Sequence, residues 1–214
     1  MNAPLRFPLT SQQTAADIAR ELGDIAVERV RLDPPIGMAT MEDLERAKGC
    51  ELIYGTLVEK AMGLKESILG MFIGRLIGIF VDERNLGVVA GEEGGLELLT
   101  GLVRKPDVAF ISWNRFPGGR LPDAAYPKLA PDLAIEVISK GNTRAEMERK
   151  RREYFAAGVT RVWEVDRFKG EVRVYSSAMR SRTLTAGDML KGEPVLPGFS
   201  VAVGDLFSYL ERRA

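Results

Sequence analysis

Two segments of the sequence each place an acidic residue beside a run of apolar residues. Asp107 lies in KPDVAFIS, and Glu136 lies in the middle of PDLAIEVIS. The apolar residues on both sides of Glu136 predict a strand that is covered on both of its faces. An ionised carboxylate in such a strand costs several kcal/mol unless a cation or a metal ion compensates it. We therefore expect both acids to have polar partners.

The helix expected after Glu136 supplies a candidate partner. The pattern predicts a helix over residues 143–157, and Thr143 with Glu146 resembles a capping box at its start. Lys150 falls on the stripe of this helix that faces the core. A lysine on that side is as anomalous as Glu136. We expect the two side chains to face each other or a common ligand.

The composition narrows the chemistry that such a cluster could perform. The chain has no histidine, which excludes serine triads, cysteine–histidine pairs and histidine-ligated zinc. It contains neither a GxxxxGK[ST] loop nor a GxGxxG turn that opens a helix. Two carboxylates form a hard-oxygen site suited to Mg²⁺ or Mn²⁺, and a nearby lysine can orient water or offset charge. This combination favours phosphodiester hydrolysis.

Length and composition are typical of one soluble domain. The chain has 214 residues, and 30 basic residues balance 30 acidic ones, so its net charge gives no indication of nucleic-acid binding. The single cysteine, Cys50, is compatible with a reducing compartment. The first residues do not resemble a signal peptide, and SILGMFIGRLIGIFV is too short to span a bilayer. We expect a cytoplasmic protein with no membrane contact.

The order of the elements predicts an α/β domain with a mixed β-sheet flanked by helices. An N-terminal helical arm over residues 1–37 precedes one domain over residues 38–214. Within that domain the pattern predicts a short helix over residues 40–47, the hairpin CELIYG–TLVEK, a helix over residues 65–81, strands at KPDVAFIS and PDLAIEVIS, the helix over residues 143–157, strands over residues 160–166 and at EVRVY, and a last helix over residues 203–210.

The helix over residues 65–81 carries Gly70, Gly74 and Gly78 at four-residue spacing. Three positions without side chains on one face allow another backbone to approach closely. This face could form a dimer interface, or the helix could press against its own sheet. The helix is apolar all round, which favours burial against the sheet. A homodimer, with the N-terminal arm exchanged between subunits, is a further expectation.

A set of motifs resembles a known family. The set comprises Asp107 in RKPDVAFI, Glu136 in PDLAIEVIS, Lys150 and Tyr154 in ERKRREYFAAGV, and the following RVWEVD. It resembles the Uma-type family of putative restriction endonucleases, which belongs to the PD-(D/E)xK nuclease superfamily. ATMEDLERAKGCELIYGTLVEK and VLPGFSVAVGDLF also resemble that family, so the resemblance covers residues 40–207.

The resemblance implies a restriction-endonuclease-like core in which Asp107 and Glu136 bind a divalent metal ion. The common superfamily pattern has a lysine two residues after the glutamate, where this chain has Ile138. The Uma-type family implies a lysine displaced to the next helix, which is Lys150 here and agrees with the helical stripe. Lys140 is a second candidate for this lysine.

Several positions depart from the family pattern. The family commonly has a histidine where this chain has Lys65 or Glu66, an aspartate at Asn142 and a proline at Arg167. Glu164 replaces a residue that is usually apolar. These departures concern substrate contacts more than the two acids expected to bind the metal.

Each candidate residue also has a purely structural interpretation. Glu136 and Lys150 could form a buried ion pair without catalysis, and Asp107 could cap the start of its strand.

The basic run Arg149, Arg151 and Arg152 could be a solvated helix face or could contact phosphate groups of nucleic acid. Glu51 and Glu59 flank the hairpin and could add a third acidic ligand, although exposed hairpin charges are the more common case.

The function expected from these features is a metal-dependent endonuclease acting on nucleic acid, with DNA as the expected substrate. Asp107 and Glu136 would hold Mg²⁺ or Mn²⁺, and Lys150 would assist the attacking water. The alternative is a catalytically inactive nuclease-like fold that binds nucleic acid or a protein partner.

Overall fold

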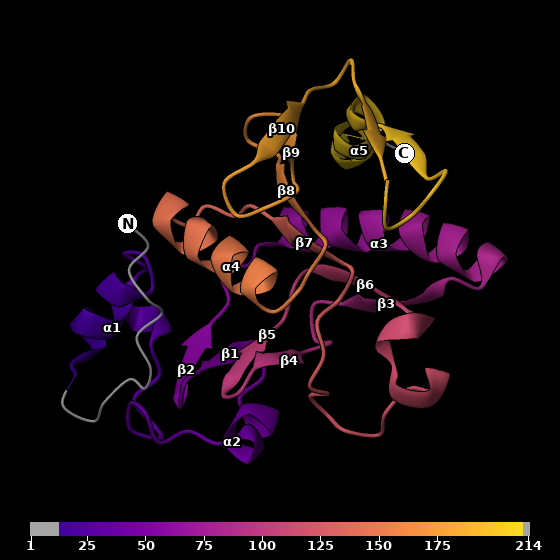
Figure 1. Cartoon of the computed structure of the whole chain (residues 1–214). Helices are drawn as coiled ribbons and strands as arrows, with labels where there is room; N and C mark the ends of the chain where they lie inside the picture. Colours follow the sequence, from indigo (N-terminus) through magenta and orange to yellow (C-terminus); the bar gives the residue numbers. More distant parts are fainter. Residues whose placement is uncertain (1–12, 212–214) are drawn as a thin grey trace.

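Figure 1 shows the computed structural model of the protein, which describes residues 13–211. A six-stranded sheet forms the centre, with helices on both faces. α3 (Leu64–Arg84) and α5 (Val203–Ser208) pack on one face, and α4 (Arg144–Ala156) packs on the other. The prediction of an α/β fold with a mixed sheet flanked by helices is confirmed.

The central sheet has the strand order β10-β9-β8-β7-β6-β3. β7 and β8 run parallel and are joined through α4, because parallel strands need a crossover connection. All other neighbouring strands in this sheet run antiparallel. Its members are β3 (Gly87–Gly91), β6 (Val108–Ser112), β7 (Leu133–Val137), β8 (Arg161–Asp166), β9 (Glu171–Tyr175) and β10 (Ser181–Leu184).

A second sheet of four strands, in the order β2-β1-β5-β4, shares a hydrophobic cluster with the α4 side of the central sheet. The sequence predicts only its hairpin. Its strands are β1 (Cys50–Ile53), β2 (Thr56–Glu59), β4 (Leu96–Leu99) and β5 (Leu102–Arg104). A further antiparallel pair is formed by β11 (Met189–Lys191) and β12 (Ser200–Ala202).

The predicted N-terminal arm is helical only in part, and its residues 1–12 lie outside the described region. It contains α1 (Ala15–Glu21), which ends before Gly23, a residue with a φ of +98°. Ile18 and Leu22 are buried in the same cluster as the core of the α4 side. Short 3-10 helices occur at Val27–Arg29, Trp113–Arg115, Pro117–Gly119 and Tyr209–Glu211.

The predicted helix starts differ in how completely their caps form. α2 (Met41–Arg46) has the full capping box, because Thr40 Oγ1 accepts from Asp43 N and the Asp43 carboxylate accepts from Thr40 N. At α4, Thr143 Oγ1 accepts a hydrogen bond from Glu146 N at 3.0 Å. The Glu146 carboxylate does not complete the box, because it binds elsewhere.

The glycines of α3 face the central sheet at two of three positions. A Cβ at Gly70 would lie 3.6 Å from Asp107 Cβ, and a Cβ at Gly74 would lie 3.5 Å from Val108 Cγ2. A Cβ at Gly78 would have no neighbour within 4 Å. Contact with the sheet therefore accounts for Gly70 and Gly74, and a dimer stays a prediction.

α3 packs against the sheet, as the sequence favours, but not all of its apolar residues are buried. Leu64, Met71 and Ile79 are exposed, because the helix packs against the sheet with one side only. Within residues 13–211, none of the helices has the length and apolar character needed to cross a membrane.

Candidate active site

Asp107 and Glu136 come together at the ends of two neighbouring strands. Val108 of β6 pairs with Ile135 of β7 in antiparallel register, which places Asp107 opposite Glu136. Asp107 Oδ2 accepts a hydrogen bond of 2.7 Å from Val137 N. Both side chains are buried. Glu136 faces α4, whereas Asp107 also lies close to α3, because a Cβ at Gly70 would be 3.6 Å from Asp107 Cβ.

Glu136 has two partners on α4. The ammonium group of Lys150 lies 3.3 Å from Oε1 and 3.2 Å from Oε2, and the Tyr154 hydroxyl donates a hydrogen bond of 2.6 Å to Oε1. Lys150 and Tyr154 are one helical turn apart and are fully enclosed. The structure thus brings Glu136 and Lys150 together, as the helical stripe predicts. Their catalytic roles stay predictions.

The alternative lysine, Lys140, is exposed beyond the end of β7.

Glu51 is a third acid in this cluster, and the expectation that it is an exposed hairpin charge is wrong. Its side chain is buried because β1 lies inside the four-stranded sheet, between β2 and β5. Glu51 Oε1 lies 3.5 Å from Lys150 Nζ and accepts a hydrogen bond from Lys105 N, while Oε2 binds Arg104 Nη1 at 2.6 Å. Apolar neighbours on both sides of Glu51 were the available signal. Glu59 is half-buried and pairs with Arg31.

Lys60 is a second cation that sequence reasoning missed. It directly follows β2, and its ammonium group lies 2.8 Å from Asp107 Oδ1. Its side chain is 8% exposed, so this ion pair is almost closed to solvent. Asp107 thus binds a lysine through one oxygen and the backbone of β7 through the other. Nothing in the local pattern around Lys60 indicates this contact, which joins residues 47 positions apart.

A buried chain of ion pairs continues from Glu51 toward the N-terminal arm. Arg104 connects Glu51 to Glu153, whose Oε2 accepts from Arg104 Nε at 2.8 Å. Glu153 Oε1 accepts from Arg149 Nε at 2.8 Å, and Arg149 Nη1 also donates to the carbonyl oxygen of Glu21. The candidate site is therefore tied to the arm through α4.

The three basic residues predicted to contact nucleic acid point to different places. Arg149 binds Glu153, Arg151 Nη1 lies 2.5 Å from Glu164 Oε1, and Arg152 pairs with Glu148 on the exposed side of α4. Successive helical residues are rotated by about 100°, so these arginines do not form one patch. Their binding to nucleic acid stays a prediction.

Two positions that depart from the family pattern bind each other. Arg167 Nε donates a hydrogen bond of 2.5 Å to Glu66 Oε1, and the Glu66 side chain is buried. Asn142 Nδ2 donates to Glu146 Oε2 at 3.0 Å. Glu66, Arg167 and Asn142 therefore make hydrogen bonds within the protein.

The surroundings shift the pKa values of Glu136 and Glu51 in opposite directions. Burial raises the pKa of the Glu136 carboxyl, and the negative charges of Asp107 and Glu51 raise it further. The positive charge of Lys150 acts in the opposite direction but does not outweigh them. Burial also opposes ionisation of Glu51, but Lys150, Arg104 and Lys60 outweigh it and lower the pKa of Glu51 to about 2.

Lys150 is buried, which disfavours its charged form. Glu136 and Glu51 outweigh the burial and raise the pKa of the Lys150 ammonium group above its ordinary value. Lys150 thus holds its proton at neutral pH and can act as a positive charge or a hydrogen-bond donor. It is not suited to take a proton from water.

A pocket of about 390 Å³ between α3 and β3 reaches Asp107. Gly70, Gly74 and Gly78 line it, and so do Val89, Ala90 and Gly91 of β3. The small residues of α3 therefore leave an open approach to one of the two acids.

The acids fit a divalent cation by their chemistry. Within residues 13–211, no group of three or more His, Cys, Asp and Glu side chains is arranged to hold a metal ion. Mg²⁺ is commonly held in proteins by one or two carboxylates, with water and substrate phosphate completing its shell. Asp107 and Glu136 supply such a pair, and Lys60 occupies one oxygen that a cation would use.

An α/β domain with two opposed carboxylates and an adjacent buried lysine agrees with the comparisons with known proteins. The model of the Uma2 family, described as "Putative restriction endonuclease", matches residues 38–204. The chain belongs to this family, and the resemblance inferred from the sequence motifs is confirmed.

The fold is shared with solved structures. One of them is the crystal structure of "a putative nuclease belonging to DUF820" from Anabaena variabilis ATCC 29413, which has 19% sequence identity and a TM-score of 0.69. The match covers 80% of this chain and 98% of that chain. None of the curated proteins matches this chain.

Proposed function

We propose that this protein is a metal-dependent nuclease that hydrolyses phosphodiester bonds of nucleic acid, with DNA as the expected substrate. The observation that carries the proposal is the placement of Asp107 opposite Glu136, with Lys150 bound to Glu136. Family membership and the fold shared with a protein described as a nuclease support it.

Asp107 and Glu136 would hold Mg²⁺ or Mn²⁺. Such an ion, when bound, acidifies a water molecule and neutralises charge on the reacting phosphate. Tyr154 fixes the orientation of the Glu136 carboxylate through its hydrogen bond. The buried Lys150 ammonium group would supply a positive charge that offsets charge on the reacting phosphate, and the low dielectric around it would strengthen this effect. Lys60 would have to leave Asp107 Oδ1.

The test is incubation of the pure protein with single- and double-stranded DNA and RNA, with and without Mn²⁺. We expect cleavage only with metal, and its loss in Asp107→Asn and in Glu136→Gln. Asp123→Asn is the matched control, because Asp123 is exposed in a loop. Cleavage that persists in Asp107→Asn would contradict the assignment.

A second candidate function is an inactive nuclease-like module that binds nucleic acid or a protein. It is favoured by the contacts of the two acids, since every carboxylate oxygen of Asp107 and Glu136 has a partner within the protein. This candidate predicts no binding of Mg²⁺ or Mn²⁺ that depends on Asp107.

A further inference from the structure

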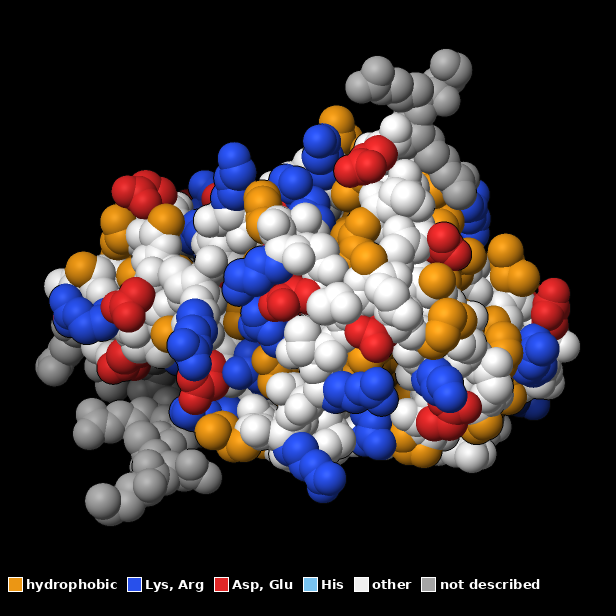
Figure 2. Space-filling model, turned by 90° about the horizontal axis from the view of Figure 1, so that it is seen from above, with side chains coloured by type: hydrophobic (Ala, Val, Ile, Leu, Met, Phe, Trp, Pro, Cys, Tyr) orange, Lys and Arg blue, Asp and Glu red, His pale blue; other side chains and the backbone are white. Residues whose placement is uncertain are grey.

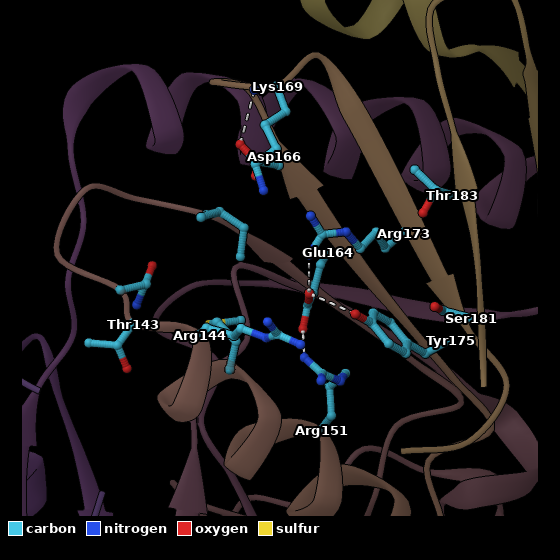
Figure 3. A pocket seen from close by; sticks show the side chains of 13 residues that line it. Thr143, Arg144, Arg151, Glu164, Asp166, Lys169, Arg173, Tyr175, Ser181 and Thr183 are labelled. Atoms are coloured by element: carbon cyan, nitrogen blue, oxygen red, sulfur yellow. Dashed lines mark hydrogen bonds and ion pairs between the residues drawn. The ribbon is translucent and has the colours of Figure 1, made fainter. Parts of the chain in front are cut away.

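A polar pocket of about 510 Å³ lies beside the candidate active site, between the start of α4 and the strands β8, β9 and β10 (Figure 3). Glu164 in this pocket is the register partner of Glu136 on the neighbouring parallel strand. Adjacent strands are ~4.8 Å apart, so the pocket begins one strand away from the acid that binds Lys150.

The lining of the pocket carries more positive than negative charge. Its charged residues are Arg144, Arg151, Glu164, Asp166, Lys169 and Arg173. Figure 3 shows Glu164 in the middle of this group. On the face seen in Figure 2, Lys and Arg side chains gather near the centre, with Asp and Glu side chains between them.

Protein groups already satisfy both acids of the pocket. Glu164 binds Arg151 at 2.5 Å and accepts a hydrogen bond of 3.2 Å from the Tyr175 hydroxyl. Asp166 lies 3.6 Å from Lys169 Nζ and accepts from backbone N–H groups of the following turn. Arg173 pairs with Glu171 and lies 4.0 Å from Glu164, so Arg144 is the basic residue of the lining that stays available.

Two donors at the pocket have no acceptor in the described part of the chain. Arg144 has no hydrogen bond or ion pair within residues 13–211, and the buried Nε of Arg151 has no partner there. The pocket also lies at the N-terminal end of α4, a helix of 13 residues, where the helix dipole favours an anion. A ligand with anionic oxygens in the pocket would give Arg144 a partner.

We infer that this pocket binds a phosphate group of the nucleic-acid strand, next to the phosphate that a metal ion at Asp107 and Glu136 would bind. The inference rests on the proposed function. Guanidinium groups match phosphate oxygens in geometry and charge. One strand of a duplex advances by ~3.4 Å of helix axis per nucleotide, so consecutive phosphates can reach both places.

Binding without cleavage tests the pocket separately from the metal chemistry. Fluorescence anisotropy in EDTA would measure the affinity of labelled single-stranded and duplex DNA at several KCl concentrations, for the wild type and Arg144→Gln. Arg182→Gln is the matched control, because exposed Arg182 lies between two lining residues of β10, Ser181 and Thr183, but points to the other face of the strand. Thermal unfolding would verify that both variants fold.

We expect Arg144→Gln to weaken binding roughly tenfold. It should also make the negative slope of log K against log[KCl] shallower by about 0.9 for duplex DNA, or about 0.7 for a single strand, the values for one phosphate contact. Arg182→Gln should leave both quantities near the wild-type values. Equal effects of the two substitutions, or no binding of either DNA by the wild type, would overturn the inference.

A binding measurement with inorganic phosphate shows whether the pocket takes a phosphate of a nucleic-acid strand or a free phosphate ion. Binding of phosphate alone that depends on Arg144, with no such dependence for DNA, would identify a site for free phosphate and overturn the inference. Arg144-dependent DNA binding without any cleavage in Mn²⁺ would support the pocket and contradict the proposed nuclease activity.

Discussion

Glu136 and Glu164 lie directly opposite each other on parallel strands β7 and β8, and consecutive residues of α4 neutralise them. Lys150 binds Glu136, and Arg151 binds Glu164. One helix therefore supplies a cation of the candidate active site and a cation of the adjacent polar pocket. A displacement of α4 should disturb both.

Loss of the Lys150 charge should destabilise the protein. Lys150→Met leaves Glu136 buried with an uncompensated charge, and we expect the free energy of unfolding to fall by about 3 kcal/mol. Glu136→Gln together with Lys150→Met should restore part of the loss. Urea unfolding of the two single variants and the double variant measures this coupling. Additive losses would mean that the two side chains do not interact.

Lys60 should compete with a metal ion for Asp107. Its ammonium group binds Asp107 Oδ1, so Lys60→Met should free that oxygen and tighten Mn²⁺ binding about tenfold, or ~1.4 kcal/mol. Isothermal titration calorimetry measures the change. Lys65→Met is the control, since Lys65 is exposed on α3. Weaker Mn²⁺ binding in Lys60→Met than in the control would contradict the competition.

The pair between Glu146 and Arg29 should make the stability depend on acid pH. Burial acts against the charged form of Glu146, but hydrogen bonding to Arg29 outweighs it and holds the pKa of Glu146 below its ordinary value of 4.5. The carboxylate thus stabilises the fold fully above pH 4.5, and this contribution is lost as the pH falls through the lowered pKa.

Glu146→Gln should therefore show a smaller loss of stability than the wild type below pH 4.5, measured by urea unfolding at a series of pH values. An identical slope in the two proteins would show that Glu146 does not titrate in this window.

Gly23 should be essential for docking the N-terminal arm against α4. Its φ is +98°, and an added Cβ would lie 2.3 Å from Glu146 N, so Gly23→Ala should lower stability by more than about 2 kcal/mol. Gly187→Ala is the matched control, because a Cβ at Gly187 has no neighbour within 4 Å. Equal melting temperatures for the two variants would contradict this packing.

The sequence predicts the contact between Glu136 and Lys150 because each residue is anomalous within a regular element, one in a buried strand and one on a buried helical stripe. Lys60 gave no such signal, since its partner Asp107 lies 47 positions away in the chain. Glu51 has apolar neighbours like those of Glu136, but its place in a hairpin favoured the interpretation as an exposed charge. β10 escaped prediction because its side chains are mostly exposed and polar, and β12 because it has only three residues with small side chains, so both lack the apolar alternation of a half-buried strand.

Calorimetric titration of Mn²⁺ into the wild type, Asp107→Asn and Glu136→Gln tests whether the two acids form a metal site. We expect the wild type to bind Mn²⁺ and each substitution to abolish or strongly weaken this binding, while the control Asp123→Asn binds like the wild type. Wild-type protein that binds no Mn²⁺, or binding that is unchanged in Asp107→Asn, would contradict the metal site.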